Sequence, residues 1–96
     1  MSAYLIVDTK INNPTAYEEY KLRAKPIVEK FGGIYRARGG AMDVQENKLW
    51  DPTRIVIIEF PDVQSAQALL DSEEYAPAKL MRQANAECTL FILEGV

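Results

Sequence analysis

The chain has 96 residues, of which 48% are apolar, and this is enough for one compact domain with one hydrophobic core. Fourteen acidic and eleven basic residues leave a net charge of −3, so the positive field that nucleic acids and anionic membranes require is missing, and we expect neither as a partner. No histidine is present, which disfavours metal and haem sites, and we expect no cofactor.

The chain begins with an apolar run, Ala3 to Thr9, that predicts a β-strand. Because no basic leader with an apolar stretch of signal length stands at the start, we expect a cytoplasmic protein. Asn13 then caps a predicted helix whose first residue is Pro14 and which ends at Gly32-Gly33. Pro26 lies inside this helix and predicts a kink there.

Strand patterns fill the middle of the chain. Ile34 to Arg38 predicts a strand, Gly39-Gly40 a bend or bulge, and Ala41 to Glu46 a continuation of the same strand. A loop from Asn47 to Thr53 then leads to the clearest strand pattern of the chain, Arg54 to Phe60. The two strands are therefore expected to be joined by this loop.

Two helical patterns and a last strand follow. Asp62 caps the second predicted helix, and Ser72 is a candidate cap for a shorter helical piece over Glu73 to Asn85, interrupted near Pro77. Cys88 to Leu93 predicts the last strand. Its first residue is the only cysteine of the chain, and we interpret it as a small buried apolar side chain.

The order βαββαβ predicts a single α+β domain over residues 1–96. Two right-handed strand–helix–strand units in this order give a four-stranded antiparallel sheet with the helices on one face, which is a ferredoxin-like sandwich. In the strand Arg54 to Phe60, Val56 and Ile58 point to one face while Ile55 and Ile57 point to the other, so both faces require burial.

The helices can cover only one apolar face of this sheet. Exposing four or five large apolar side chains would forgo roughly 1.5–3 kcal/mol each, so we expect a homodimer formed through the uncovered face, a dimeric α/β barrel. Two alternatives stay open for this face: the last residues of the chain fold beneath it, or it is a groove for a lipid or another ligand.

Short motifs that extend over nearly the whole chain carry a resemblance. They are Asn13-Pro14 with Tyr17 and Tyr20, Phe31-Gly32-Gly33, Arg38-Gly39-Gly40, Ile58-Glu59-Phe60-Pro61, Ser72-Glu73-Glu74-Tyr75 and Glu94-Gly95-Val96. In these motifs the sequence resembles the dimeric α/β-barrel family known only as a domain of unknown function. The resemblance implies a ferredoxin-like protomer and a back-to-back dimer, as in small cofactor-free monooxygenases and muconolactone-isomerase-like proteins, and it implies no established substrate.

Charged residues interrupt the apolar strands at three positions. Arg36 and Arg38 alternate along their strand, so both are expected on one face, and Arg38 is expected to pair with Glu59. In one interpretation Arg38 and Glu59 are catalytic residues at the mouth of a cavity, where Arg38 binds a carboxylate or enol and Glu59 moves a proton. In the other, they form a structural ion pair that fixes the register of two strands.

Aromatic side chains supply the remaining candidates for a site. With Arg36, the candidate ligand-binding residues are Tyr17, Tyr20, Trp50 and Tyr75, which can bind by stacking or through hydroxyl groups. The alternative for the tyrosines at helical spacing is a place in the core, and Trp50 can instead anchor a dimer.

Two functions follow from these candidates. The first is a small-molecule-binding protein or cofactor-free enzyme that takes a small organic acid or aromatic ligand near Arg38 and Glu59. The second is a non-catalytic dimeric module for protein interaction or regulation. Lys79 and Arg82 fall on the polar side of their helical pattern and are expected to be solvated.

Overall fold

The computed structural model describes all 96 residues, which form four strands and three helices. The strands are β1 (Ala3–Ile11), β2 (Ile34–Arg38), β3 (Ile55–Phe60) and β4 (Ala86–Glu94). The helices are α1 (Pro14–Lys30), α2 (Val63–Asp71) and α3 (Ala76–Asn85). The predicted order of strands and helical regions is confirmed, and none of the helices has the length and apolar character needed to cross a membrane.

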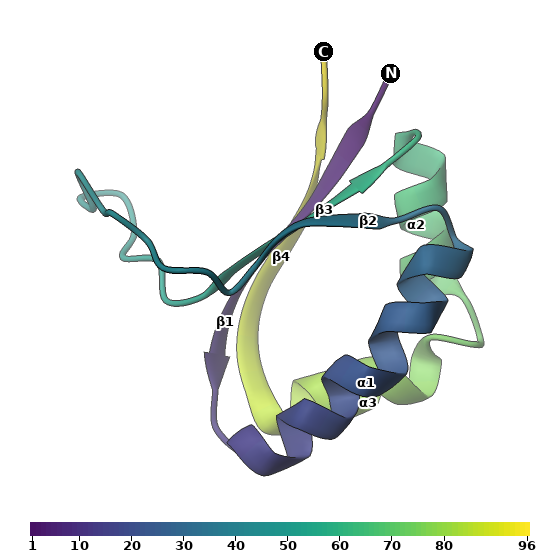
Figure 1. The fold of residues 1–96 in the computed structure, drawn as a ribbon, viewed down its shortest axis with the longest axis horizontal. Coiled ribbons are helices and arrows are strands. Elements are labelled where there is room, and N and C mark those ends of the chain that lie inside the picture. The colour runs from purple at the N-terminus through teal and green to yellow at the C-terminus, as the bar shows by residue number, and fades with distance from the viewer.

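The four strands form one antiparallel sheet in the order β2-β3-β1-β4. β1 lies in the centre and pairs with β4 along its whole length, from Ala3 opposite Glu94 to Ile11 opposite Ala86. All three helices lie on one side of the sheet, and the two chain ends lie close together (Figure 1). This is the sandwich that the element order predicted.

Helix α1 begins and ends with the signals seen in the sequence. The Asn13 side chain accepts a hydrogen bond from the backbone N–H of Ala16 at 3.2 Å, and Pro14 occupies the first turn. The helix continues through Pro26 to Lys30 without a break. It ends before Gly32, whose φ of 89° lies in the left-handed region that favours glycine.

The second helical region is divided as the sequence suggested, with different boundaries. Asp62 caps α2 by accepting a hydrogen bond of 2.7 Å from the backbone N–H three residues later. The Ser72 hydroxyl accepts a hydrogen bond from the backbone N–H of Tyr75 at 3.1 Å, and α3 begins only after this turn. Pro77 therefore lies in the first turn of α3, where its missing N–H costs nothing, and it does not interrupt the helix.

The core lies between the sheet and the helices. Side chains that alternate along β1 and β3 point into it and pack on both α1 and α2. Its buried members are Leu5, Val7, Ala24, Val28, Val56, Ile58, Phe60, Ala66, Leu69, Tyr75 and Ala78. Thr9 and Tyr17 are also buried.

The opposite face of the sheet is apolar and has no cover within this chain. Its apolar side chains, all partly or well exposed, are Tyr4, Ile6, Ile34, Ile55, Ile57, Phe91 and Leu93. Leu93 and Ile34 are 52% and 50% exposed and Phe91 is 39% exposed. The prediction that both faces are apolar and that the helices cover only one of them is confirmed.

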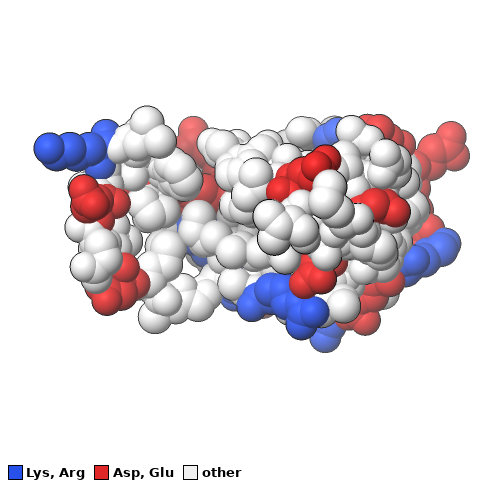
Figure 2. Space-filling view, turned by 90° about the horizontal axis from the view of Figure 1, so that it is seen from above, with Lys and Arg blue, Asp and Glu red and all other residues white.

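Residues 39–54 form one long loop, so the predicted continuation of the second strand over Ala41 to Glu46 is wrong. The last pairing of β2 joins Arg38 to Val56, and the Gly39 N–H donates to the carbonyl of Ile55 at 2.9 Å, where β3 begins. Beyond this point no neighbouring strand is present to accept hydrogen bonds. The loop extends from the sheet on the side opposite the helices (Figure 1) and forms a lobe apart from the main body (Figure 2).

Candidate functional site

A β-bulge in β2 decides which way its arginines point. Tyr35 lies opposite Ile58, but Ala37 lies opposite Ile57, so one extra residue, Arg36, is inserted between them. Side chains alternate along a strand, and one inserted residue reverses the faces of all that follow. Arg36 therefore points to the uncovered face and Arg38 to the helix-covered face, and the prediction that both share a face is wrong.

The predicted pair of Arg38 and Glu59 is wrong for the same reason. Glu59 lies on the uncovered face, where its carboxylate accepts a hydrogen bond from Nε of Arg36 at 3.0 Å. Arg38 instead donates from Nη2 to the backbone carbonyl of Lys21 at 3.0 Å, inside the core layer. The ion pair between two strands is therefore formed by Arg36 and Glu59. The structure does not bring Arg38 and Glu59 together in one cavity.

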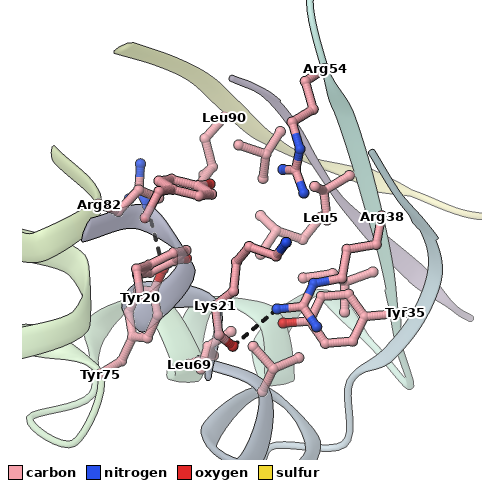
Figure 3. Close-up of a pocket in the computed structure, with 15 residues that line it drawn as sticks. Leu5, Tyr20, Lys21, Tyr35, Arg38, Arg54, Leu69, Tyr75, Arg82 and Leu90 are labelled. Carbon is pink, nitrogen blue, oxygen red and sulfur yellow. Dashed lines mark hydrogen bonds between the residues drawn. The ribbon is translucent and has the colours of Figure 1, made fainter. Parts of the chain in front are cut away.

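A cavity of about 40 Å³ lies between the sheet and helices α1 and α3 (Figure 3). A water molecule needs at least about 10–15 Å³ of such space, so the cavity holds about three waters. Four of the five tyrosines of the chain line it, together with an aliphatic floor from the sheet. The lining residues are Leu5, Val7, Tyr17, Tyr20, Lys21, Val28, Tyr35, Arg38, Arg54, Val56, Ile58, Leu69, Tyr75, Arg82 and Leu90.

Three of the five arginines of the chain line this cavity, and none of the three forms an ion pair: Arg38, Arg54 and Arg82. The other two, Arg23 and Arg36, lie on the surface and each pairs with a glutamate at 3.0 Å. No aspartate or glutamate lines the cavity. In an acidic protein, the arginines without a carboxylate partner are therefore gathered around one enclosed space, where a low dielectric strengthens their attraction for an anion.

Lys21 is a fourth cation at the edge of the cavity. Its ammonium group pairs with Glu18 at 3.0 Å, and its side chain is 30% exposed. The ion pair neutralises part of its charge, and the exposure places it at the rim. Lys21 therefore supplies less of the positive potential than the three arginines.

Backbone and aromatic contacts hold Arg38 and Arg54 in place. The Arg38 guanidinium lies 4.3 Å from the centre of the Tyr35 ring, and that of Arg54 lies 5.7 Å from the centre of the Tyr17 ring. Gly39 has a φ of 70°, and a Cβ atom there would lie 2.5 Å from Nε of Arg54. The glycine that follows Arg38 is thus required both for the turn and for the path of the Arg54 side chain.

Arg82 lies at the other side of the cavity and is only 6% exposed (Figure 3). Its Nε donates to the Tyr75 hydroxyl at 3.4 Å, and the hydroxyls of Tyr75 and Tyr20 are 2.7 Å apart. The prediction that Arg82 is solvated is wrong, because α3 packs beside α1 and turns this side chain inward. The only signal in the sequence was the spacing of four residues between Ala78 and Arg82, which places both on one helix face, and the structure buries both.

Burial sets the protonation of the tyrosines around the cavity. It raises the pKa of Tyr17, Tyr20 and Tyr35, and in Tyr20 the neighbouring Tyr75 hydroxyl raises it further. Burial alone would lower the pKa of Arg82, but the hydrogen bond with the Tyr75 hydroxyl outweighs it and raises this pKa. The three tyrosines with raised pKa values are therefore neutral hydrogen-bond donors at neutral pH, and Arg82 is a cation.

Trp50 does not reach the cavity. Its indole N–H donates to the Asp8 carboxylate at 2.9 Å, and the backbone N–H groups of Thr53 and Arg54 donate to the same carboxylate at 2.9 and 3.0 Å. Burial raises the pKa of Asp8, but these three hydrogen bonds outweigh it and the pKa is lowered. Asp8 thus anchors the base of the 39–54 loop, and with it the backbone of Arg54.

Of the predicted ligand-binding residues, the structure brings together Tyr17, Tyr20 and Tyr75, and it leaves Arg36 and Trp50 outside the cavity. Two arginines of the site, Arg54 and Arg82, were not among the residues predicted from the sequence. Arg54 directly precedes the apolar strand β3, and Arg82 lies within helix α3. Only the packing of the helices on the sheet brings these two side chains to the same cavity.

Comparisons with solved structures support this fold. A protein of unknown function from Rhodopseudomonas palustris, RPA0582, is 19% identical with a TM-score of 0.77, and the match covers 99% of this chain and 82% of that one. A dimeric ferredoxin-like protein of unknown function from Jannaschia sp. CCS1 is 17% identical with a TM-score of 0.68, covering 99% and 100%. SnoaB from Streptomyces nogalater, a cofactor-independent oxygenase, is 10% identical with a TM-score of 0.73, covering 99% and 93%.

These identities show a shared ferredoxin-like fold and nothing finer, and a comparison with curated proteins found no match. A comparison with protein families matches residues 2–96 to the family described as Domain of unknown function (DUF1330). The expected membership of a family known as a domain of unknown function is therefore confirmed over almost the whole chain, and this protein belongs to the DUF1330 family.

Proposed function

We propose that this protein binds a small organic acid in the cavity between the sheet and the helices, with Arg38 and Arg54 holding the carboxylate. The observation that carries the proposal is that every arginine without a carboxylate partner lines this one cavity. A guanidinium group matches a carboxylate with two parallel N–H donors, and both groups here are already oriented by stacking on tyrosine rings.

The size of the cavity limits which ligand fits without a change in the protein. An acid with more than a few heavy atoms exceeds the enclosed 40 Å³, so its binding requires the rim side chains to move outward. Lys21, at the rim, has a long flexible stem that allows this, whereas the aliphatic floor belongs to paired strands and is fixed. We therefore expect Lys21 to move on binding, while the two arginines and the floor stay in place.

A cofactor-free reaction in the same cavity is an extension of this proposal. SnoaB, which is described as a cofactor-independent oxygenase, shows that a protein of this fold can perform chemistry without a cofactor. In this chain the groups available at the cavity are guanidinium donors and neutral tyrosine hydroxyls. These groups stabilise an enolate or carboxylate oxygen.

Calorimetric titration with short carboxylic acids tests the binding proposal. Arg38→Gln removes a charge-assisted contact, so we expect affinity for butyrate to fall about tenfold or more. Arg23→Gln removes an arginine from the surface pair with Glu19 and is the matched control, for which we expect no change. If no acid binds to the folded protein, or if both variants lose affinity equally, the proposal is wrong, and the non-catalytic dimeric module becomes the better account.

We further propose that the protein is a homodimer in which the uncovered sheet faces of two copies pack together. The face carries seven apolar side chains, and the Arg36–Glu59 pair beside them satisfies its own charges. The 39–54 loop extends on the same side of the sheet (Figure 1) and carries four further exposed apolar residues, Met42, Val44, Leu49 and Trp50. It is therefore placed to contact the second copy.

Sedimentation velocity at micromolar concentration tests the dimer. Phe91→Glu places a charge on the uncovered face and is expected to shift the protein to a folded monomer, because the charge would be desolvated at the interface. Leu80→Glu, at a 67% exposed position on α3, is the control and should remain dimeric. A monomeric unmodified protein would refute the dimer, as would equal dissociation of both variants.

A further inference from the structure

The cavity has polar groups at two separate places. Arg38 at the end of β2 and Arg54 just before β3 lie on one side, and Arg82 with Tyr20 and Tyr75, from α3, α1 and the residue before α3, lies on the other (Figure 3). The sheet beneath them supplies aliphatic lining residues, Leu5, Val7, Val56 and Ile58, and the Lys21 side chain extends between the two groups (Figure 3). A ligand that fills the cavity therefore meets polar groups at each end and the apolar surface of the sheet beneath it.

The helix-side cluster has hydrogen-bond donors left to offer. Arg82 has five N–H donors and no acceptor, and its Nε uses one of them on the Tyr75 hydroxyl at 3.4 Å. The hydroxyls of Tyr20 and Tyr75 bond to each other at 2.7 Å, which uses one of their two protons. Whichever tyrosine donates, the other retains an O–H that is free to donate to a third group.

No carboxylate within the chain neutralises the charge of this cluster. Arg82 forms no ion pair, and no carboxylate lines the cavity, although Arg82 is only 6% exposed. A buried guanidinium without an anion is costly, and a negatively charged or carbonyl oxygen from a ligand would offset its charge.

We infer that Arg82, Tyr20 and Tyr75 form a second oxygen-binding subsite, so that the ligand carries two oxygen-bearing ends joined by a short apolar segment. The chemical class is a short dicarboxylate or keto acid. This inference rests on the proposed function, since Arg38 and Arg54 hold the first carboxylate. It adds that the helix side of the cavity selects for a second acidic or carbonyl group.

Paired acids of equal chain length test this subsite. Calorimetric affinities are measured for propionate against malonate, butyrate against succinate, and valerate against glutarate, at fixed pH and ionic strength. We expect at least one diacid to bind about tenfold more tightly than its monoacid, the gain expected from one additional charge-assisted contact. Arg82→Gln should abolish this advantage while changing the affinity of the monoacid less than about threefold.

A second variant keeps the test decisive if Arg82→Gln fails to fold, as judged by circular dichroism. Tyr20→Phe keeps the ring and removes one hydroxyl, and it should reduce the diacid advantage without weakening the monoacid. Equal affinities for all three pairs, or an advantage that survives in the folded variants, would overturn the second subsite. If Arg38→Gln still weakens every acid in that case, the proposed function stands, whereas no binding by any acid refutes both.

Discussion

Gly39→Ala tests whether the Arg-Gly-Gly motif exists to position Arg54. Gly39 has a φ of 70°, and an added Cβ atom would lie 2.5 Å from Nε and 2.8 Å from Cζ of Arg54. Gly40, the next residue, does not have a positive φ, and a Cβ atom added there would have no neighbour within 4 Å. Alanine is therefore expected to lower the stability at Gly39 and not at Gly40.

The expected change in stability follows from the backbone angle and the close contact at Gly39. A residue other than glycine in the left-handed region costs roughly 1–2 kcal/mol, and the close contact forces the Arg54 guanidinium to move. A loss of 1 kcal/mol lowers the melting temperature of a domain of this size by roughly 4–8 °C, so Gly39→Ala should lower it by roughly 4–16 °C. Gly40→Ala should leave the free energy of unfolding unchanged or raise it by up to about 1 kcal/mol.

Thermal unfolding followed by circular dichroism, at one protein concentration, measures both variants. Titration with butyrate gives a second readout, since displacing Arg54 should weaken binding in Gly39→Ala and not in Gly40→Ala. Equal melting temperatures for the two variants would refute the backbone argument. A destabilised Gly39→Ala that binds butyrate like the unmodified protein would refute the role of Gly39 in positioning Arg54.

Two further predictions concern the loop anchor and the core. Because the pKa of Asp8 is lowered in the folded protein, its ionised carboxylate stabilises the fold above its unfolded pKa of about 3.9, and this stabilisation is lost as the pH falls through the folded pKa. Asp8→Asn should therefore flatten the acid end of the plot of melting temperature against pH. Parallel curves for the variant and the unmodified protein would contradict this. Leu69 is 1% exposed, so Leu69→Ala should lower the free energy of unfolding by about 2–5 kcal/mol, whereas Leu80→Ala, at a 67% exposed position, should lower it by less than about 0.5 kcal/mol. Urea unfolding measures both variants, and similar losses would contradict the assigned core.

The uncovered sheet face connects the fold to the proposed assembly. Phe91 and Leu93 of β4 are exposed in the protomer although their strand is fully paired with β1. An apolar face of this extent on a single chain is typical of an interface. The 39–54 loop, which is longer than most connections within a domain, lies on the same side, and loops of this length are commonly functional.

Much of the fold was predictable because its signals are local. Asn13 with Pro14 marked the start of α1, Asp62 marked the start of α2, and the structure shows both caps. Errors arose where a segment depends on its neighbours. Ala41 to Glu46 has a strand-like composition, but no strand lies beside it to pair with, so it remains a loop.

For the candidate site, the sequence indicated the residue types and some of the positions. Tyr17, Tyr20 and Tyr75 were candidates for a ligand site, and all three line the cavity. Arg38 was expected in a cavity and lines one, but the partner expected for it was wrong, because the bulge at Arg36 could not be located from composition.

The amino-acid sequence by itself determined the order of the elements, the helix caps and a sheet with two apolar faces, because these depend on periodicity and on residues close together in the chain. Only the tertiary structure decided that Arg38, Arg54 and Arg82 meet around one cavity without a carboxylate. The physical reason is that the direction of a side chain depends on strand register and helix rotation, and one bulged residue or one packed helix changes which charges face each other.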